Sequence, residues 1–394
     1  MEYKSQLSSI QKTTVIKNIN ESSKNYIIHN FILENKFNFI LYIVESNFEL
    51  ELATKEIEFY SQDIEILKFP EWDIVPYDIN SPDIKIQTER IKTLNKLLSI
   101  DKEKKHILIL SKNSIVQKVP NKDDLNTINF FINQKITKES IKYTIESNCY
   151  QLKNTASNLG DYCINNNTID IATFDEQYYK IKIIDNIITE IKSFNPKTQI
   201  AFNSHDDILL LPIREILFYK NNIQNFKQNY RKLFSNSMEN DDLYTNISSN
   251  ILYNGSENWL PLFYNNELTS ILNYIPQNSV IFYSKKIEDK TANFRKTVEK
   301  FYNLRAEERK INKNSTYNPI PIELMYLEMN KIKSKLDEYI NLIFDTENTI
   351  RNKNHITLNF KTVPNFQSDE KEVFKTLQKY LDKALNKAEY KTYN

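Results

Sequence analysis

The sequence predicts an α/β fold in which a parallel sheet is interrupted by an antiparallel α+β insertion. Apolar strands alternate with amphipathic helices up to about residue 119, strands then follow one another to about residue 211, and the α/β pattern returns afterwards. The chain has 394 residues, more than the roughly 250 to 300 at which one core stops growing. We therefore expect two or more domains.

The first third of the chain predicts a βαβαβ arrangement, which is typical of a parallel sheet covered by helices. Each predicted strand is a short, almost unbroken apolar run, as in strands that are buried on both faces. The predicted elements are a helix Val15–Glu34, a strand Phe37–Val44, a helix Phe48–Ser61, a strand Ile64–Phe69, a helix Ile84–Leu98 and a strand His106–Ser111.

A long loop is predicted between Phe69 and Ser81, because three prolines remove backbone donors and favour extended geometry before them. Trp72 and Tyr77 supply large apolar rings with polar atoms that can fix such a loop in place. We expect them to hold the loop across the sheet domain, with Arg90 on the next helix helping.

The insertion is predicted as one strand, one helix and then several strands. Asp185 and Asn186 separate two alternating runs and tolerate left-handed geometry, which predicts a tight hairpin turn. The predicted elements are a strand Thr127–Asn133, a helix from about Thr137 through Ser147, and strands Tyr150–Asn154, Thr168–Ala172, Tyr178–Ile184, Ile187–Phe194 and Ile208–Leu211.

The last part of the chain returns to helices and apolar strands. Its final strand and helix predict the start of a further α/β domain, which we expect to be incomplete. The predicted elements are helical structure from Ile216 to Leu252, a strand Ser279–Ser284, helices Ile287–Lys310 and Glu323–Tyr339, strands Asn341–Phe344 and His355–Lys361, and a helix Ser368–Lys391.

The composition excludes several kinds of site. The net charge of +1 gives no general attraction to nucleic acid or membrane, and no run approaches the roughly 20 apolar residues of a membrane span. Two cysteines, Cys149 and Cys163, offer neither a metal site nor a disulfide framework, so we expect reduced thiols in a cytoplasmic protein. No metal is expected, and the four scattered histidines indicate no catalytic centre.

Nucleotide binding is not expected either, because the chain contains only two glycines. A phosphate-binding loop needs several glycines for positive φ and close backbone approach. The strand-to-helix junctions at residues 44–47 and 111–114 contain neither glycine nor a Lys-Ser/Thr pair. The sequence thus predicts a nucleotide-binding type of fold without a nucleotide, and no cofactor.

Seven motifs stand out along the chain. The first is FPEWDIVPYDINSPDIKIQTERIKTL, with Trp72, Pro76, Tyr77, Asp78, Ser81, Pro82 and Arg90. The others are ILILSKNSIVQKVP, GDYC, IDI, IITEIKSFNPKTQ, LLLPIREI and ENWLPLF, the last containing Trp259. In this order they resemble the N-terminal, UvrB-like region of the bacterial transcription-repair coupling factors (Mfd), and the first motif matches the most recognisable pattern of that family.

The resemblance implies a degenerate P-loop-ATPase-like domain formed by residues 1–119 and 212–340, interrupted by a UvrA-interaction domain at 120–211. Residues 341–394 would begin an additional α/β domain. In the full-length family an ATP-dependent DNA translocase motor and an RNA polymerase-binding domain follow, and both are absent from these 394 residues. The resemblance therefore implies no enzymatic activity for this chain.

The UvrA-contact surface implied by the resemblance consists of Tyr150, Gln151, Tyr162, Asn165, Asn166 and Ile169. Family members usually carry arginines after the tyrosine that corresponds to Tyr150 and shortly after the GDYC motif, where this chain has Gln151 and Asn165-Asn166. A guanidinium offers a planar fork of donors that a neutral amide cannot replace. These departures predict a weakened affinity for UvrA.

The leading functional prediction is a non-catalytic, monomeric interaction module that recruits UvrA in transcription-coupled nucleotide excision repair. A variant of it is a truncated or split remnant of the coupling factor that lacks the motor. The alternatives are a helicase-like ATP-binding or DNA-binding protein and an α/β enzyme of the nucleotide-sugar type. Few glycines argue against the enzymes, and the near-neutral charge argues against DNA binding.

Overall fold

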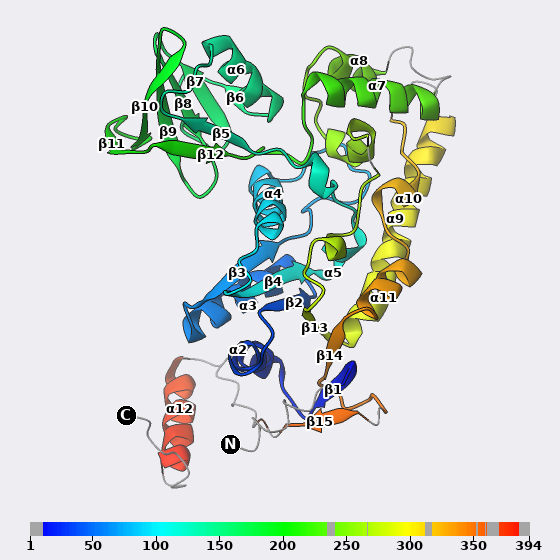
Figure 1. Cartoon of the computed structure of the whole chain (residues 1–394). Coiled ribbons are helices and arrows are strands. Elements are labelled where there is room, and N and C mark those ends of the chain that lie inside the picture. The colour runs from blue at the N-terminus through cyan, green and yellow to red at the C-terminus, as the bar shows by residue number, and fades with distance from the viewer. Residues whose placement is uncertain are drawn as a thin grey trace.

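A computed structural model describes residues 11–234, 241–265, 267–311, 317–351, 354–358, 360 and 370–385. Figure 1 shows a sheet with flanking helices in the lower part of the molecule and a separate, smaller sheet at the upper left. None of the helices in these ranges combines the length and the apolar character needed to cross a membrane.

The larger sheet has seven strands, all parallel, in the order β15-β1-β14-β13-β2-β4-β3. The strands are β1 (Thr13–Lys17), β2 (Phe39–Val44), β3 (Ile64–Phe69), β4 (Lys105–Ser111), β13 (Val280–Ser284), β14 (Ile340–Asp345) and β15 (His355–Thr357). All six residues of β2 are buried, as the unbroken apolar run predicted. The expected α/β fold with a parallel sheet is therefore confirmed.

The two faces of this sheet are covered by different helices. Ile40 and Tyr42 of β2 point into a core shared with α2 (Lys24–Glu34) and α3 (Asn47–Tyr60). Their neighbour Leu41 points into a second core, because side chains alternate along a strand. That core also holds side chains of α4 (Ile84–Leu98), α5 (Lys112–Val116), α9 (Lys286–Ile311) and α11 (Met329–Leu336).

Two predictions for the ends of this sheet are wrong. Residues 13–17 form β1 and not the start of a helix, which begins only at Lys24. Residues 341–394 do not simply begin an additional domain, because β14 lies between β1 and β13, and β15 pairs with β1. Pairing between the two distant ends of the chain decides both cases, and neither segment shows this pairing locally.

The insertion contains a six-stranded sheet in the order β11-β10-β9-β8-β7-β6, antiparallel except for the β6–β7 pair. The strands are β6 (Gln151–Leu152), β7 (Asp161–Ile164), β8 (Thr168–Ala172), β9 (Tyr178–Ile184), β10 (Ile187–Phe194) and β11 (Ala201–Ser204). Helix α6 (Lys138–Ser147) packs beside them. Asp185 and Asn186 both have positive φ, as the predicted hairpin requires.

The chain enters and leaves the insertion through β5 (Ile128–Phe131) and β12 (Asp207–Leu210), which pair with each other in an antiparallel two-stranded sheet. These two segments join the insertion to the rest of the molecule (Figure 1). The expected antiparallel insertion within residues 120–211 is thus present, while the exact domain limits stay a prediction.

The remaining helices follow the insertion. The predicted helix Glu323–Tyr339 is wrong as one unit: its chain forms two short helices separated at Tyr326, whose backbone is extended. These elements are α7 (Lys220–Phe234), α8 (Asp242–Ser248), the 3-10 helices η3 (Ser256–Phe263) and η4 (Ile271–Asn273), α10 (Ile322–Met325) and α12 (Glu370–Leu385). The short 3-10 turn η1 (Glu21–Ser23) precedes α2, and the turn η2 (Lys122–Asp124) precedes β5. The predicted ends of α12 lie outside the described residues.

Candidate functional site

The insertion meets the parallel-sheet domain at a junction built on a buried ion pair. Arg90 of α4 and Glu215, in the chain segment after β12, are both fully buried. The Nε atom of Arg90 donates to both carboxylate oxygens at 3.1 Å, and its Nη1 donates to the carbonyl of Pro70 at 2.9 Å. Burial lowers the pKa of the guanidinium, which the neighbouring Glu215 counteracts.

The same carboxylate holds the proline-rich loop. Trp72 donates its indole N–H to Oε2 of Glu215 at 2.6 Å, and the guanidinium of Arg90 lies 4.1 Å from the centre of the Phe69 ring. Arg90 thus binds both the loop and the segment that leaves the insertion, which agrees with the role expected of it.

A second buried carboxylate, Glu257 of η3, lies about one turn along the same face of α4, beside Gln87, which also accepts from the Glu215 amide. It accepts hydrogen bonds from Arg214 at 2.5 Å, from Gln87 at 3.0 Å and from Ser81 at 2.7 Å. Its side chain is completely buried, so these three partners replace the water that a charged group needs. We call residues 211–219, which lead from β12 to α7, the crossover. Two networks of charged side chains therefore bind the loop, α4 and the crossover to one another.

Tyr77 fixes the middle of the loop in a left-handed conformation, with φ of 59°. Such a backbone is unfavourable for a residue with a side chain and needs support from its surroundings. The support comes from Asn258, which accepts from the Tyr77 amide at 3.0 Å and donates to the carbonyl of Asp78 at 2.9 Å, and from Ile320, whose carbonyl accepts the Tyr77 hydroxyl at 3.1 Å.

The other residues of the loop motif also have structural positions. Pro76 and Pro82 are buried, and the Pro82 carbonyl accepts from Gln87 at 3.0 Å. Trp259 is buried and donates its indole N–H to the carbonyl of Asn318 at 2.8 Å. These residues therefore shape the fold of the parallel-sheet domain around the junction.

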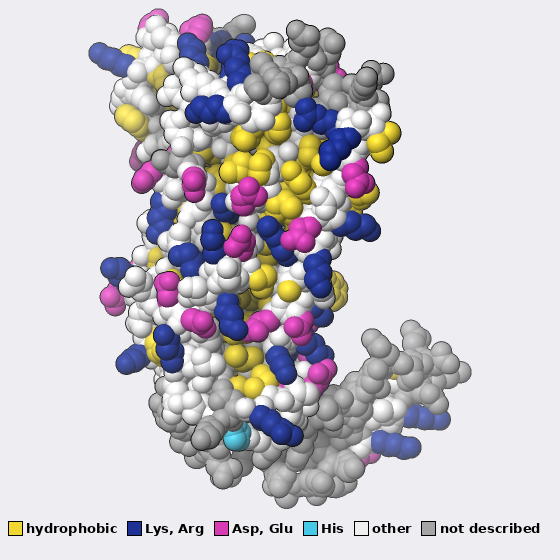
Figure 2. Space-filling model, turned by 90° about the vertical axis from the view of Figure 1, so that its right-hand side faces the viewer, with side chains coloured by type: hydrophobic (Ala, Val, Ile, Leu, Met, Phe, Trp, Pro, Cys, Tyr) yellow, Lys and Arg dark blue, Asp and Glu magenta, His cyan; other side chains and the backbone are white. Residues whose placement is uncertain are grey.

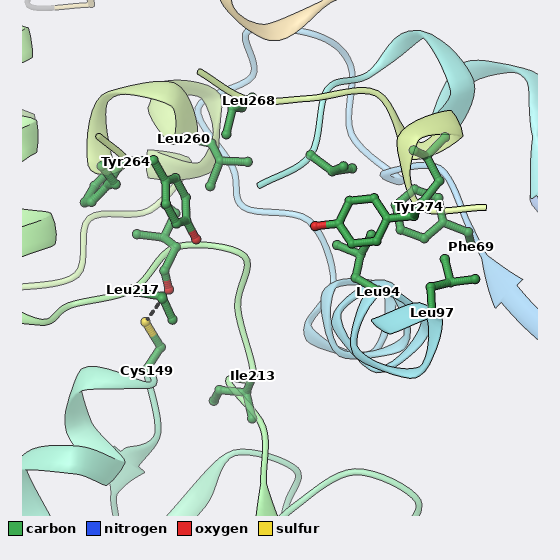
Figure 3. Close-up of a cluster of buried hydrophobic side chains, with 14 of the residues drawn as sticks. Phe69, Leu94, Leu97, Cys149, Ile213, Leu217, Leu260, Tyr264, Leu268 and Tyr274 are labelled. Atoms are coloured by element: carbon green, nitrogen blue, oxygen red, sulfur yellow. Dashed lines mark hydrogen bonds between the residues drawn. The ribbon is translucent and has the colours of Figure 1, made fainter. Parts of the chain in front are cut away.

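Apolar packing continues through the junction into the insertion. Figure 3 shows Leu217 of the crossover between a group that contains Leu260 and Tyr264 and the thiol of Cys149, while Ile213 lies farther along the crossover. That thiol donates to the carbonyl of Ile216 at 3.3 Å, and burial raises its pKa to about 12. Cys149 is thus a packed, unreactive thiol at the end of α6.

The corner of the sheet where a nucleotide phosphate would sit is filled by the chain itself. After β2, Ser46 caps α3 by accepting from the Glu49 amide at 3.3 Å, and the Glu49 carboxylate accepts from the Glu45 amide at 2.9 Å. A carboxylate already lies at the helix N-terminus, where a phosphate would be attracted. Nearby, burial raises the pKa of Glu71.

Half of the predicted UvrA-contact residues are buried in the insertion. Tyr150, Tyr162 and Ile169 are 3%, 0% and 0% exposed. The Tyr150 hydroxyl donates to the carbonyl of Leu211 at 3.0 Å, and the Tyr162 hydroxyl donates to Glu146 at 2.6 Å. These side chains pack inside the insertion. A partner that binds to the surface of this structure would therefore not contact them.

The other three predicted residues, Gln151, Asn165 and Asn166, are exposed at one side of the insertion sheet. Gln151 lies on β6, which pairs only with β7, and the two asparagines lie in the β7–β8 loop. The ammonium group of Lys138 donates to the carbonyls of Asn165, at 2.9 Å, and Asn166. We call Gln151, Leu152, Asn165 and Asn166 the β6 edge.

Sequence reasoning missed several residues that matter here. Leu152 is 53% exposed on the β6 edge, where an apolar side chain gives a partner something to bury. Arg214 and Glu215 lie in the motif LLLPIREI and Glu257 lies in ENWLPLF, but neither motif predicts a structural role for them. Their burial could not be read from charge patterns, since charged residues are almost never fully buried unless paired.

The right-hand side of the molecule, formed largely by α9 and neighbouring helices, does not form a basic surface. Figure 2 shows Lys and Arg side chains interspersed with Asp and Glu over this face. Pairs such as Arg295–Glu299 and Arg305–Glu308 follow helical spacing on α9. The face therefore carries no concentrated positive charge that would favour a nucleic-acid backbone.

Comparison with known proteins identifies the relatives of this chain. A family model described as "UvrB interaction domain" matches residues 128–216. The transcription-repair-coupling factor of Rickettsia prowazekii is 27% identical over 326 residues, covering 82% of this chain and 29% of that protein. The factor of Escherichia coli is 22% identical over 323 residues, covering 80% of this chain and 27% of that protein.

The chain spans less than a third of the length of these curated relatives, at 29% and 27%. The matches extend over about four-fifths of this chain, as the series of motifs along the sequence predicted. The similarity to the N-terminal, UvrB-like region of the transcription-repair coupling factors is therefore confirmed, and residues 128–216 match its UvrB interaction domain.

Proposed function

We propose that this chain is a non-catalytic interaction module that recruits UvrA in transcription-coupled nucleotide excision repair. The observation that carries the proposal is the match of residues 128–216 to the UvrB interaction domain, together with the exposed β6 edge of that same segment. RNA polymerase and DNA would be contacted by other parts of a coupling factor. We place the activity in the cytoplasm, where the bacterial chromosome is repaired.

The β6 edge would bind UvrA through main-chain groups and neutral side chains. An edge strand has unpaired backbone N–H and C=O groups that can accept another strand or loop. Gln151, Asn165 and Asn166 add amide groups, and Leu152 adds apolar area. None of the four carries a charge, so we expect binding that is weaker and less salt-dependent than arginine-mediated contacts would give.

The non-catalytic part of the proposal is supported by the start of α3. The Glu49 amide of α3 donates to Ser46, and the Glu49 carboxylate accepts from the Glu45 amide just before the helix, so accepting a phosphate there would require this carboxylate to move. We therefore expect no ATP binding by the purified chain in an equilibrium titration with a labelled nucleotide.

The test is a calorimetric titration of UvrA with the full chain and with the variant Gln151→Arg/Asn165→Arg. Each charge-assisted hydrogen bond is worth about 1.5 to 3 kcal/mol, so one well-placed arginine should tighten binding by about ten-fold or more. Both positions are exposed, so the substitutions should leave the fold intact.

The matched control is Ala201→Arg/Asn203→Arg, which adds the same two charges at exposed positions of β11, at the opposite edge of the sheet. It should leave the affinity unchanged. Absence of binding at tens of micromolar for the wild-type chain and for the double variant would contradict the proposal, as would an equal gain from the control.

A further inference from the structure

Helix α3 carries apolar side chains on two faces, of which the sheet uses only one. Its inner face packs through Leu50, Ala53 and Ile57, all buried. On the outer side Phe48 is 78% exposed and Phe59 is 85% exposed.

Leu52, 44% exposed, lies between these two phenylalanines. Positions 48, 52 and 59 are spaced by four and seven residues, so they form one line along the helix, which the exposed Lys55 shares between Leu52 and Phe59. We call Phe48, Leu52 and Phe59 the outer stripe. Packing of α3 on its own sheet does not account for it.

Helix α12 has an apolar face that is equally uncovered. Phe374 is 73% exposed and Leu377 is 36% exposed, while Lys375 and Lys379 lie on the opposite side of the helix by their spacing. Figure 1 shows α12 standing apart from the sheet, below α3. An amphipathic helix of this kind gains stability by packing its apolar face against another surface.

The path of the chain brings α12 towards the outer stripe. After β15 the side chain of Leu358 is buried, and the ring of Phe360 lies 6.4 Å from that of Tyr26 on α2. Tyr26 in turn lies 5.6 Å from Tyr60, the last residue of α3. The chain therefore leaves the sheet domain beside the C-terminal end of α3, next to Phe59.

The lengths also agree. Residues 361–369 can span at most about 30 Å when extended, which is longer than the roughly 21 Å of α3. Helix α12, with 16 residues, is about 24 Å long, close to the length of α3. Starting beside Tyr60, α12 can run back along α3 without any change in the sheet.

We propose that α12 packs antiparallel on the outer stripe of α3, with Phe374 beside Phe59. This contact buries the two exposed apolar surfaces against each other within one chain. It also explains why α3 carries phenylalanines on the side that faces away from its own sheet.

Crosslinking tests the contact and its direction. In the variant Phe59→Cys/Phe374→Cys a short bismaleimide should join the two residues within one chain. In the matched variant Phe48→Cys/Phe374→Cys the residues would be about 16 Å apart along α3, so the reaction should be about ten-fold slower. The natural thiols do not compete, because Cys149 and Cys163 are buried and burial raises the pKa of both.

Equal rates for the two pairs, or no reaction in either, would overturn the proposal. A crosslinked product with the mass of two chains would overturn it in favour of a second copy as the occupant. All three substituted side chains are exposed, so loss of folding is not the expected cause of a negative result.

Hydrogen exchange gives a second measurement. Phe59→Lys should speed amide exchange in residues 370–385 by about ten-fold, because it removes the contact that protects α12. Phe202→Lys on β11, where the phenylalanine is 61% exposed, is the matched control and should change nothing in α12. Unchanged exchange in the Phe59→Lys variant would contradict the proposal.

Discussion

The junction and the β6 edge carry polar groups of opposite character. At the junction Arg90, Glu215 and Glu257 are charged, fully buried and bonded to several partners each. At the β6 edge Gln151 and the two asparagines are neutral and exposed. A buried charge left without its partner is costly, whereas an exposed amide can change with little effect on folding.

This difference bears on what the motifs that resemble those of the coupling factors can report. The loop and helix motifs contain residues that the fold needs, such as Trp72 and Arg90, and a match there reports a shared structure. Residues that would contact a partner can be replaced while the fold remains. Similarity in the motifs is therefore strong support for the fold and weaker support for UvrA binding.

The largest effect is expected from Arg90→Met, which leaves the Glu215 carboxylate buried without its charged partner. Breaking a buried pair in this way costs about 3 to 5 kcal/mol of unfolding free energy. Urea unfolding, followed by circular dichroism, measures it.

The control is Arg90→Met/Glu215→Gln, in which neither residue of this pair is charged and an amide oxygen can still accept from Trp72. It should recover a large part of the lost stability. A double variant less stable than the single one would show that the charge itself is not what makes the junction sensitive.

A smaller effect is expected from Gly255→Ala. The glycine has φ of 77°, and a Cβ atom would lie 2.5 Å from the backbone oxygen of Ile79. The left-handed backbone alone costs about 1 to 3 kcal/mol for a residue with a side chain. Gly160 also has positive φ, 85°, so Gly160→Ala carries the same backbone strain, but its close contacts would be with the terminal methyl groups of Ile213 and Ile84, which can move.

Thermal unfolding of both alanine variants compares the two sites, and Gly255→Ala should have the lower Tm. An equal loss of Tm in Gly160→Ala would mean that the insertion side of the junction is as rigid as the loop side.

The smallest effect is expected from Lys92→Ala. Lys92 of α4 pairs with Asp175 of the insertion at 2.7 Å, but both side chains are more than a third exposed, at 37% and 46%. Exposed pairs contribute about 0 to 1 kcal/mol, and salt screens them. A loss above this range in urea unfolding would indicate that the insertion is held by its surface as well as by the buried junction.

The sequence predicted regular elements well wherever the local pattern decides them. Strand β3 and helix α4 begin and end at the predicted residues, as do β8, β9 and β10. Apolar periodicity and turn residues lie within these segments, so no distant contact is needed to recognise them.

Distant contacts explain the errors. Ile16 and Ile19 fit a helical spacing, yet Ile16 belongs to β1 because Phe344 of β14 and Ile356 of β15 lie beside it. In the insertion, the motifs placed Tyr150 and Tyr162 in the right segment but could not show that both rings point inward. The neighbours of a side chain, and hence its role, come from the tertiary structure.

The position of β1 has a consequence for folding during synthesis. Thr13 lies opposite Asn341, so the first strand of the chain cannot be paired until β14 has left the ribosome. The strands β7, β8 and β9 of the insertion pair with one another within a short segment, so its sheet can form much earlier. We infer an order in which the sheet of the insertion forms first and the larger sheet closes last, with β1 unpaired in between.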